Sequence, residues 1–220
     1  MPRAGSQLTL LDTGTSLPNG FVYRPDFLTP EEETELLGYF EDLPFSHSRL
    51  GEYVAKRRII GFGWGYDFAK EKLIPGPPLP PFLRPLQRKI GKWLDIPPAR
   101  VVEALVTEYQ PGSAIGWHRD NESFDSIIGI SLAGWCRMRL RPLQRTGIYR
   151  NPKDVIALPL EPRSAYCMQK DSRWKYQHSI PKVETLRYSI TFRTLPRSIP
   201  TPTHPVSLPL PGRRRDSRRR

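Results

Sequence analysis

Apolar and polar residues alternate in short runs along the second half of the chain, from about residue 101 to residue 192. Runs of this length with a period of two are typical of β-strands, and no helical period lies between them. The predicted strands cover residues 101–106, 127–132, 134–140, 155–158, 164–168 and 187–192. Several short strands at this spacing predict a mainly β fold, a β-sandwich or a jelly roll.

Two segments in the first half of the chain have helical spacing instead, after a short strand at residues 21–23. The first has Thr29 as its N-cap, Pro30 in its first turn and Glu32 completing a capping box. Its apolar positions are Leu36, Leu37, Phe40 and Leu43. The second spans about residues 82–95, after a proline-rich connector at residues 74–81 that cannot be helical. We expect both N-terminal helices to pack on the sheet.

The length and composition predict one folded domain with short extensions. A chain of 220 residues is long enough for a single domain with a substantial core. We predict a flexible leader at residues 1–18, the domain at residues 19–195 and a disordered Pro/Arg-rich tail at residues 196–220. The tail contains seven arginines and one aspartate, so it carries half of the formal net charge of +12. A segment of this composition cannot bury a core.

The positive charge favours a polyanionic partner. Nucleic acid is preferred over a membrane, because no hydrophobic run approaches the length of a bilayer span. Cys136 and Cys167 show no CxxC spacing, which favours reduced thiols over a disulfide or a zinc site. The N-terminus lacks the apolar segment of a signal peptide, so we expect a cytoplasmic location, with nucleoid or nucleus also open. We also expect a monomer.

The candidate chemistry is concentrated in the segment Tyr109–Asp120. His118 and Asp120 are separated by two positions, so on an extended chain their side chains point to the same side. With the distal His178 they would form the two-histidine, one-carboxylate set that binds ferrous iron and leaves coordination positions open. The alternative is a surface turn. Only four histidines occur, and two of the three outside the tail belong to this set.

A second candidate element is the strand at residues 187–193. Arg187, Ser189, Thr191 and Arg193 alternate with apolar residues and share one face. Two guanidinium groups on one face suit a dicarboxylate, because the planar fork of arginine binds a carboxylate with two hydrogen bonds. The alternative is a surface strand with a solvated polar face.

These motifs, in this order, resemble the AlkB-type Fe(II)/2-oxoglutarate-dependent dioxygenases, in particular bacterial-type AlkB homologues. The family pattern is Asn-x-Tyr-x-Pro-Gly, His-x-Asp, a distal His and Arg-x-Asn-x-Thr-x-Arg, and the match is best between about Val102 and Leu195. Thr107 and Ser189 stand where the family has asparagine, and both keep a hydroxyl group that can form hydrogen bonds. The resemblance implies a double-stranded β-helix.

The resemblance also assigns roles. His118, Asp120 and His178 would ligate Fe(II). Arg187 and Tyr109 would hold the far carboxylate of the cosubstrate 2-oxoglutarate, with Arg193 near its 1-carboxylate and Thr107 and Ser189 also in the binding site. The implied reaction consumes dioxygen, and oxidative demethylation of an alkylated nucleobase in DNA or RNA is the function that we predict.

Candidate substrate contacts are Trp64, Tyr66 and Glu122. Residues 56–68 mix cations, aromatics and glycines, a composition suited to stacking a base and holding its phosphates. Relatives use the corresponding segment as a lid over the nucleotide, and an acidic residue at the offset of Glu122 contacts the base. A buried hairpin and an exposed glutamate are the alternatives.

Two other functions remain open at this point. Enzymes of related families with the same fold oxidise proteins and small molecules, and the metal-binding motif does not identify the substrate. The chain could also be a non-catalytic nucleic-acid-binding relative, although its complete set of ligand and clamp residues argues against that alternative.

Overall fold

The computed structural model describes residues 16–50, 52–67, 70–144 and 152–199. In these residues the strands are β1 (Phe21–Arg24), β2 (Ser46–Leu50), β3 (Tyr53–Asp67), β4 (Lys72–Pro75), β5 (Val101–Tyr109), β6 (Ile115–His118), β7 (Ile127–Leu132), β8 (Cys136–Pro142), β9 (Ile156–Leu160), β10 (Ala165–Met168), β11 (Tyr176–Ile180) and β12 (Arg187–Thr194). The α-helices are α1 (Pro30–Phe40), α2 (Arg84–Leu94) and α3 (Lys170–Trp174). Three 3₁₀ turns cover Pro81–Leu83, Pro98–Arg100 and Pro152–Asp154.

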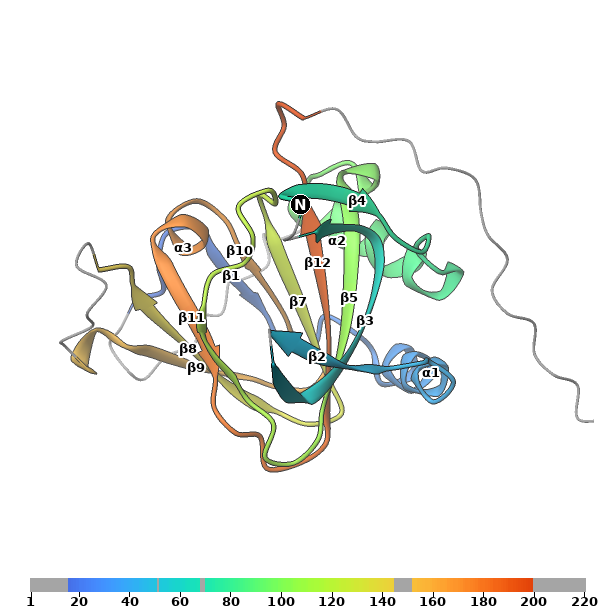
Figure 1. The fold of residues 1–220 in the computed structure, drawn as a ribbon, viewed down its shortest axis with the longest axis horizontal. Coiled ribbons are helices and arrows are strands. Elements are labelled where there is room, and N and C mark those ends of the chain that lie inside the picture. The colour runs from blue at the N-terminus through green and yellow to red at the C-terminus, as the bar shows by residue number, and fades with distance from the viewer. Residues whose placement is uncertain (1–15, 51, 68–69, 145–151, 200–220) are drawn as a thin grey trace, which may run out of the picture.

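The strands form two antiparallel sheets that face each other (Figure 1). The larger sheet has the order β1-β10-β7-β12-β5-β3-β2, and β4 pairs with β3. The smaller sheet has the order β6-β11-β8-β9. This arrangement confirms the predicted jelly roll, and it puts β12 at the centre of the larger sheet, between β5 and β7.

The two faces of the larger sheet have different partners. Helices α1 and α2 lie on the side away from the smaller sheet (Figure 1). Their apolar residues pack against alternate residues of the central strands in one core, which includes Leu36, Phe40, Leu86, Ile90, Ala104, Val106, Ile190 and Phe192. The intervening residues of β5 and β12 therefore point between the two sheets, where the cavity described below lies.

The local sequence signals account for most of these elements. Glu32 and Thr29 form the predicted capping box, with hydrogen bonds of 2.8 and 3.2 Å. Helix α1 ends at Phe40, so Leu43 lies in the turn that follows and still packs on the core. All six predicted strands of the second half are present, with ends shifted by at most two or three residues.

Residues 56–67 belong to β3, a strand of 15 residues that pairs with β2, β4 and β5. Sequence patterns did not predict its pairing with β5, and they did not predict β11. The predicted leader and tail lie largely outside the described residues and stay predictions. Within the described part of the chain, no helix is long and apolar enough to cross a membrane.

Candidate active site

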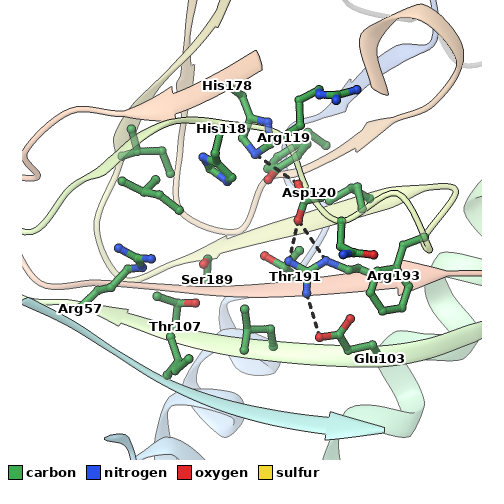
Figure 2. Close-up of a pocket in the computed structure, with 18 of the residues that line it drawn as sticks. Arg57, Glu103, Thr107, His118, Arg119, Asp120, His178, Ser189, Thr191 and Arg193 are labelled. Carbon is green, nitrogen blue, oxygen red and sulfur yellow. Dashed lines mark hydrogen bonds and ion pairs between the residues drawn. The ribbon is translucent and has the colours of Figure 1, made fainter. Parts of the chain in front are cut away.

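Three potential metal ligands converge between the sheets (Figure 2). His118 is the last residue of β6 and lies directly opposite His178 of β11, while Asp120 follows two residues after His118. The ligand atoms of the three side chains all lie within 4.8 Å of one another. Nδ1 of His118 is 2.9 Å from the carbonyl oxygen of Gly116, so Nδ1 carries the proton and Nε2 is free to bind a metal.

Asp120 is oriented by Arg193. Nε and Nη2 of Arg193 both donate to Oδ1 of Asp120, at 3.0 and 2.6 Å, while Oδ2 faces Nε2 of His178 at 3.4 Å. Burial alone would raise the pKa of Asp120, but the charge of Arg193 and the neighbouring histidines hold this pKa well below its ordinary value. The carboxylate is therefore ionised, and Oδ2 is the oxygen available to a cation.

His178 is neutral in this environment. Burial lowers the pKa of His178 to about 3, and the proximity of His118 contributes in the same direction. A neutral imidazole is the form that binds a metal ion, because the protonated ring has no lone pair to donate. Two imidazoles and one carboxylate match the donor set that binds Fe(II).

Arg187 provides a second binding feature on the same face of the cavity. Its side chain is 1% exposed, its Nε donates to Oγ of Ser131 at 3.0 Å, and its guanidinium lies 5.0 Å from the ring centre of Tyr109. Among the described residues, Nη1 of Arg187 is buried without a hydrogen-bond partner. A buried guanidinium nitrogen in this state fits an anionic ligand that completes its hydrogen bonds.

The central strands line one cavity of about 320 Å³ that contains both features. The register of β12 and β5 pairs Arg187 with Tyr109 at one end of the lining and Arg193 with Glu103 at the other. Between them lie two pairs that also line the cavity, Ser189–Thr107 and Thr191–Leu105. Figure 2 shows Ser189, Thr107 and Thr191 on these strands. The predicted alternation along β12 is thus confirmed.

Residues 20–193 of the chain match the 2OG-Fe(II) oxygenase superfamily. The chain belongs to this superfamily. Among its relatives, the uncharacterized protein L905 of Acanthamoeba polyphaga mimivirus is 30% identical over 200 residues, which cover 80% of this chain and 85% of the relative. The alkylated DNA repair protein ALKBH8 homolog of Arabidopsis thaliana is 25% identical over 213 residues, 85% of this chain but 58% of that longer protein.

The solved structure of OsALKBH1 has the same fold, with a TM-score of 0.59 and 14% identity, and it covers 82% of this chain and 100% of its own. The protein is thus an AlkB-like dioxygenase, an enzyme whose cofactor is Fe(II) and whose cosubstrates are 2-oxoglutarate and dioxygen. Its cavity fits both groups. The three convergent ligands could hold the iron. Nη1 of Arg187, which is buried and has no partner in the described part of the chain, suits the carboxylate of 2-oxoglutarate.

The three predicted substrate contacts of this dioxygenase lie in different places. Tyr66 of β3 lines the cavity. Trp64 is half-buried, packs against the core between the sheets and lies outside the cavity lining. Glu122 has a side chain that is 69% exposed and accepts from Nη2 of Arg119 at 2.9 Å, on the outside of the loop that follows Asp120. Of the three predicted contacts, the structure therefore places Tyr66 alone in the cavity with His118, Asp120 and His178.

Sequence patterns missed four residues around the site. Glu103 accepts a hydrogen bond from Nη1 of Arg193 at 2.9 Å, and Oγ of Ser131 accepts one from Nε of Arg187. Arg173 is 2% exposed and its Nη2 donates to the carbonyl oxygens of Asp120, Asn121 and Phe124. Tyr166 of β10 lines the cavity. Alternation along β5 could have identified Glu103. Glu103, Thr107 and Tyr109 are all separated by even numbers of residues, so their side chains lie on the same face of the strand.

Proposed function

We propose that this AlkB-like dioxygenase removes N-methyl groups from nucleobases of DNA or RNA by oxidative demethylation, with His118, Asp120 and His178 as its iron ligands. The observation that carries the proposal is the cavity itself, which contains the three convergent ligand atoms and the buried guanidinium of Arg187. A site of this construction can bind a cation and a dicarboxylate side by side.

In the proposed complex, Arg187 and Tyr109 bind the distal carboxylate of 2-oxoglutarate, and the hydroxyl groups of Thr107 and Ser189 lie along the bound molecule. Burial raises the pKa of Tyr109, so its phenol keeps its proton and can donate a hydrogen bond to the carboxylate. Arg193 holds Oδ1 of Asp120 and thereby directs Oδ2 to the metal.

When bound, Fe(II) and 2-oxoglutarate supply an oxidising chemistry in which dioxygen converts 2-oxoglutarate to succinate and carbon dioxide and hydroxylates a C–H bond of the substrate. An N-methyl group hydroxylated in this way becomes a hemiaminal, which releases formaldehyde and leaves the unmethylated base. The residues of the chain orient the reactants and exclude water from between the sheets. Because the ligands are recessed, a base must be flipped out of a duplex or belong to a single strand.

Support for a nucleic-acid substrate comes from charge and from similarity. The formal net charge of +12 attracts a polyanion. One relative is named an alkylated DNA repair protein. Tyr66 is our foremost candidate for contact with the base, because it lines the cavity. Trp64 packs against the core and Glu122 is exposed outside the cavity, so both are weaker candidates.

The test uses the full chain with Fe(II), 2-oxoglutarate and single-stranded oligonucleotides that carry 3-methylcytosine or 1-methyladenine. We expect formaldehyde and succinate in equal amounts. His178→Ala should abolish both products. His47→Ala is the matched control, because His47 of β2 lies outside the cavity lining, and its activity should equal that of the wild type.

Full turnover by the His178→Ala protein would refute the iron site. Succinate formation that depends on His178 but not on any methylated oligonucleotide would keep the dioxygenase and refute the nucleobase substrate. A methylated peptide or a small metabolite would then be the class to examine.

A further inference from the structure

Tyr166 lines the cavity, and its ring packs against the backbone of a glycine on the neighbouring strand. Its partner in the antiparallel register is Gly129 of β7, and the next residue across the sheet is Thr191 of β12. A Cβ atom placed on Gly129 would lie 2.2 Å from Cε1 of Tyr166 and 2.6 Å from its hydroxyl oxygen. The phenol ring therefore covers the backbone of Gly129, and any larger residue at position 129 would displace it.

The ring is fixed in this orientation from the other side as well. It stacks on Phe21 of β1, with ring centres 5.8 Å apart and an angle of 7° between the planes. The ring is thus held between a stacked aromatic residue and a bare backbone, while Tyr166 contributes to the wall of the cavity. Little conformational entropy remains to be lost when its hydroxyl group meets a ligand.

The hydroxyl group of Tyr166 has no hydrogen bond within the described part of the chain, and its ionisation is coupled to the groups of the active site. Burial raises the pKa of Tyr166, and the negative charge of Asp120 adds to this effect. The phenol therefore stays protonated and is available as a donor in the cavity that the iron ligands also line. Tyr166 is half-buried and lines the cavity, so its hydroxyl group is within reach of a ligand acceptor there.

The end of 2-oxoglutarate nearest the metal needs such a donor. Arg193 was expected there from the family resemblance, but each of its three side-chain nitrogens already donates to a carboxylate, two to Asp120 and one to Glu103. At the opposite end of the cavity, Arg187 is the group available to the distal carboxylate. Tyr166 is a donor without a partner, among the described residues, in the region between these two arginines.

We propose that Tyr166 is a cosubstrate-binding residue, whose hydroxyl group donates a hydrogen bond to the metal-end oxygens of 2-oxoglutarate, and that Gly129 is the residue that makes room for it. The inference rests on the proposed iron and 2-oxoglutarate sites but not on the nucleobase substrate. It adds to the binding site a residue that the family motif does not contain.

The test is an anaerobic titration of the Fe(II)-loaded full chain with 2-oxoglutarate, followed by the visible charge-transfer band of the complex, without nucleic acid. Tyr166→Phe keeps the ring, its stacking on Phe21 and its contact with Gly129, so the fold should be retained. The dissociation constant for 2-oxoglutarate should rise about tenfold to a hundredfold, the effect of losing one hydrogen bond to a charged acceptor. In the wild type, a donor at the keto or carboxylate oxygens stabilises the acceptor orbital of the charge-transfer transition. Tyr166→Phe removes this donor, so the transition energy should rise and the band should move to shorter wavelength.

Tyr39→Phe is the matched control, since Tyr39 is 43% exposed on α1 and stacks on Phe82. It should leave the affinity and the band unchanged. An unchanged affinity in Tyr166→Phe would overturn the inference. A weaker affinity with an unmoved band would also overturn it, because the contact would then be at the distal carboxylate.

Absence of any band in the wild type would overturn both this inference and the proposed iron site. A band in the wild type without demethylation of oligonucleotides would refute the nucleobase proposal alone. The thermal midpoint of Tyr166→Phe provides a check on folding that does not depend on ligand. If that variant is unfolded, Gly129→Ala offers a second route, because displacement of the phenol should weaken 2-oxoglutarate binding in the same way.

Discussion

Replacement of Arg187 by lysine is the sharpest test of the cosubstrate site. The guanidinium is 1% exposed and is fixed by the bond of its Nε to Ser131, so its other nitrogens are oriented before a ligand arrives. Lysine presents a point charge in place of a planar fork, so it loses one of the two hydrogen bonds to the carboxylate. Hydrogen bonds to charged groups contribute about 1.5–3 kcal/mol, which corresponds to a loss of affinity of roughly tenfold to a hundredfold.

The assay is the dependence of succinate formation on 2-oxoglutarate concentration, together with anaerobic binding. Arg187→Lys should raise the KM for 2-oxoglutarate by this factor, whereas Arg88→Lys, on the outer surface of α2, should not change it. An unchanged KM would mean that another residue binds the distal carboxylate and would refute the assignment.

A second consequence concerns stability. Without cosubstrate, the buried Nη1 of Arg187 lacks a hydrogen-bond partner among the described residues, a state that costs about 1–3 kcal/mol. Arg187→Met should therefore leave the Tm of the free protein unchanged or raise it. The wild type should gain about 2.7 kcal/mol of stability at a 2-oxoglutarate concentration of about 100 times its Kd, and the methionine variant should gain none. A clear fall in the Tm of the free variant would contradict this account.

Three further predictions test the fold and the tail. Gly129→Ala should lower the free energy of unfolding by about 1–3 kcal/mol, because the added methyl group displaces Tyr166. Gly38→Ala should instead raise the Tm, because a Cβ atom at this position of α1 meets nothing within 4 Å. The hydrogen bond from Arg58 lowers the pKa of Glu108 below its ordinary value. This ion pair therefore stabilises the fold fully above the ordinary pKa of a glutamate, and the stabilisation is lost as the pH falls through the lowered pKa of Glu108. The Tm difference between wild type and Glu108→Gln should shrink below about pH 4.3, and a larger difference there would contradict a stabilising pair. Deletion of residues 212–220 should flatten the plot of log affinity for single-stranded DNA against log salt by roughly 0.7 for each phosphate that these residues neutralise, and equal slopes would exclude a phosphate tether.

The sequence predicted those parts of the site that depend on local periodicity. Alternation along residues 187–193 is a property of one strand, and it correctly put Arg187, Ser189, Thr191 and Arg193 on one face. The capping box at Thr29 and Glu32 is likewise formed within four residues. Such signals survive folding because the backbone geometry of the element fixes them, independently of what the element packs against.

Pairing between distant segments left no comparable signal. Glu103 meets Arg193 across β5 and β12, 90 positions away, and Ser131 meets Arg187 across β7 and β12. The contact of Tyr166 with Gly129 likewise depends on the register of β10 against β7. The strands themselves were predictable, but their order and register in the sheets arise from long-range packing that one sequence does not reveal.

The position of Glu122 shows how a long-range contact ends a local pattern. Offsets of two residues keep side chains on one side only while the backbone is extended, and β6 ends at His118. Beyond Asp120 the carbonyl oxygens of Asp120, Asn121 and Phe124 all turn toward Nη2 of Arg173, which is buried about fifty positions further along the chain. Because one guanidinium nitrogen gathers three carbonyl groups, the chain must bend there, and the alternation that relates His118 to Asp120 cannot continue to Glu122. Its side chain accordingly lies in solvent beside Arg119, while Asp120 lines the cavity.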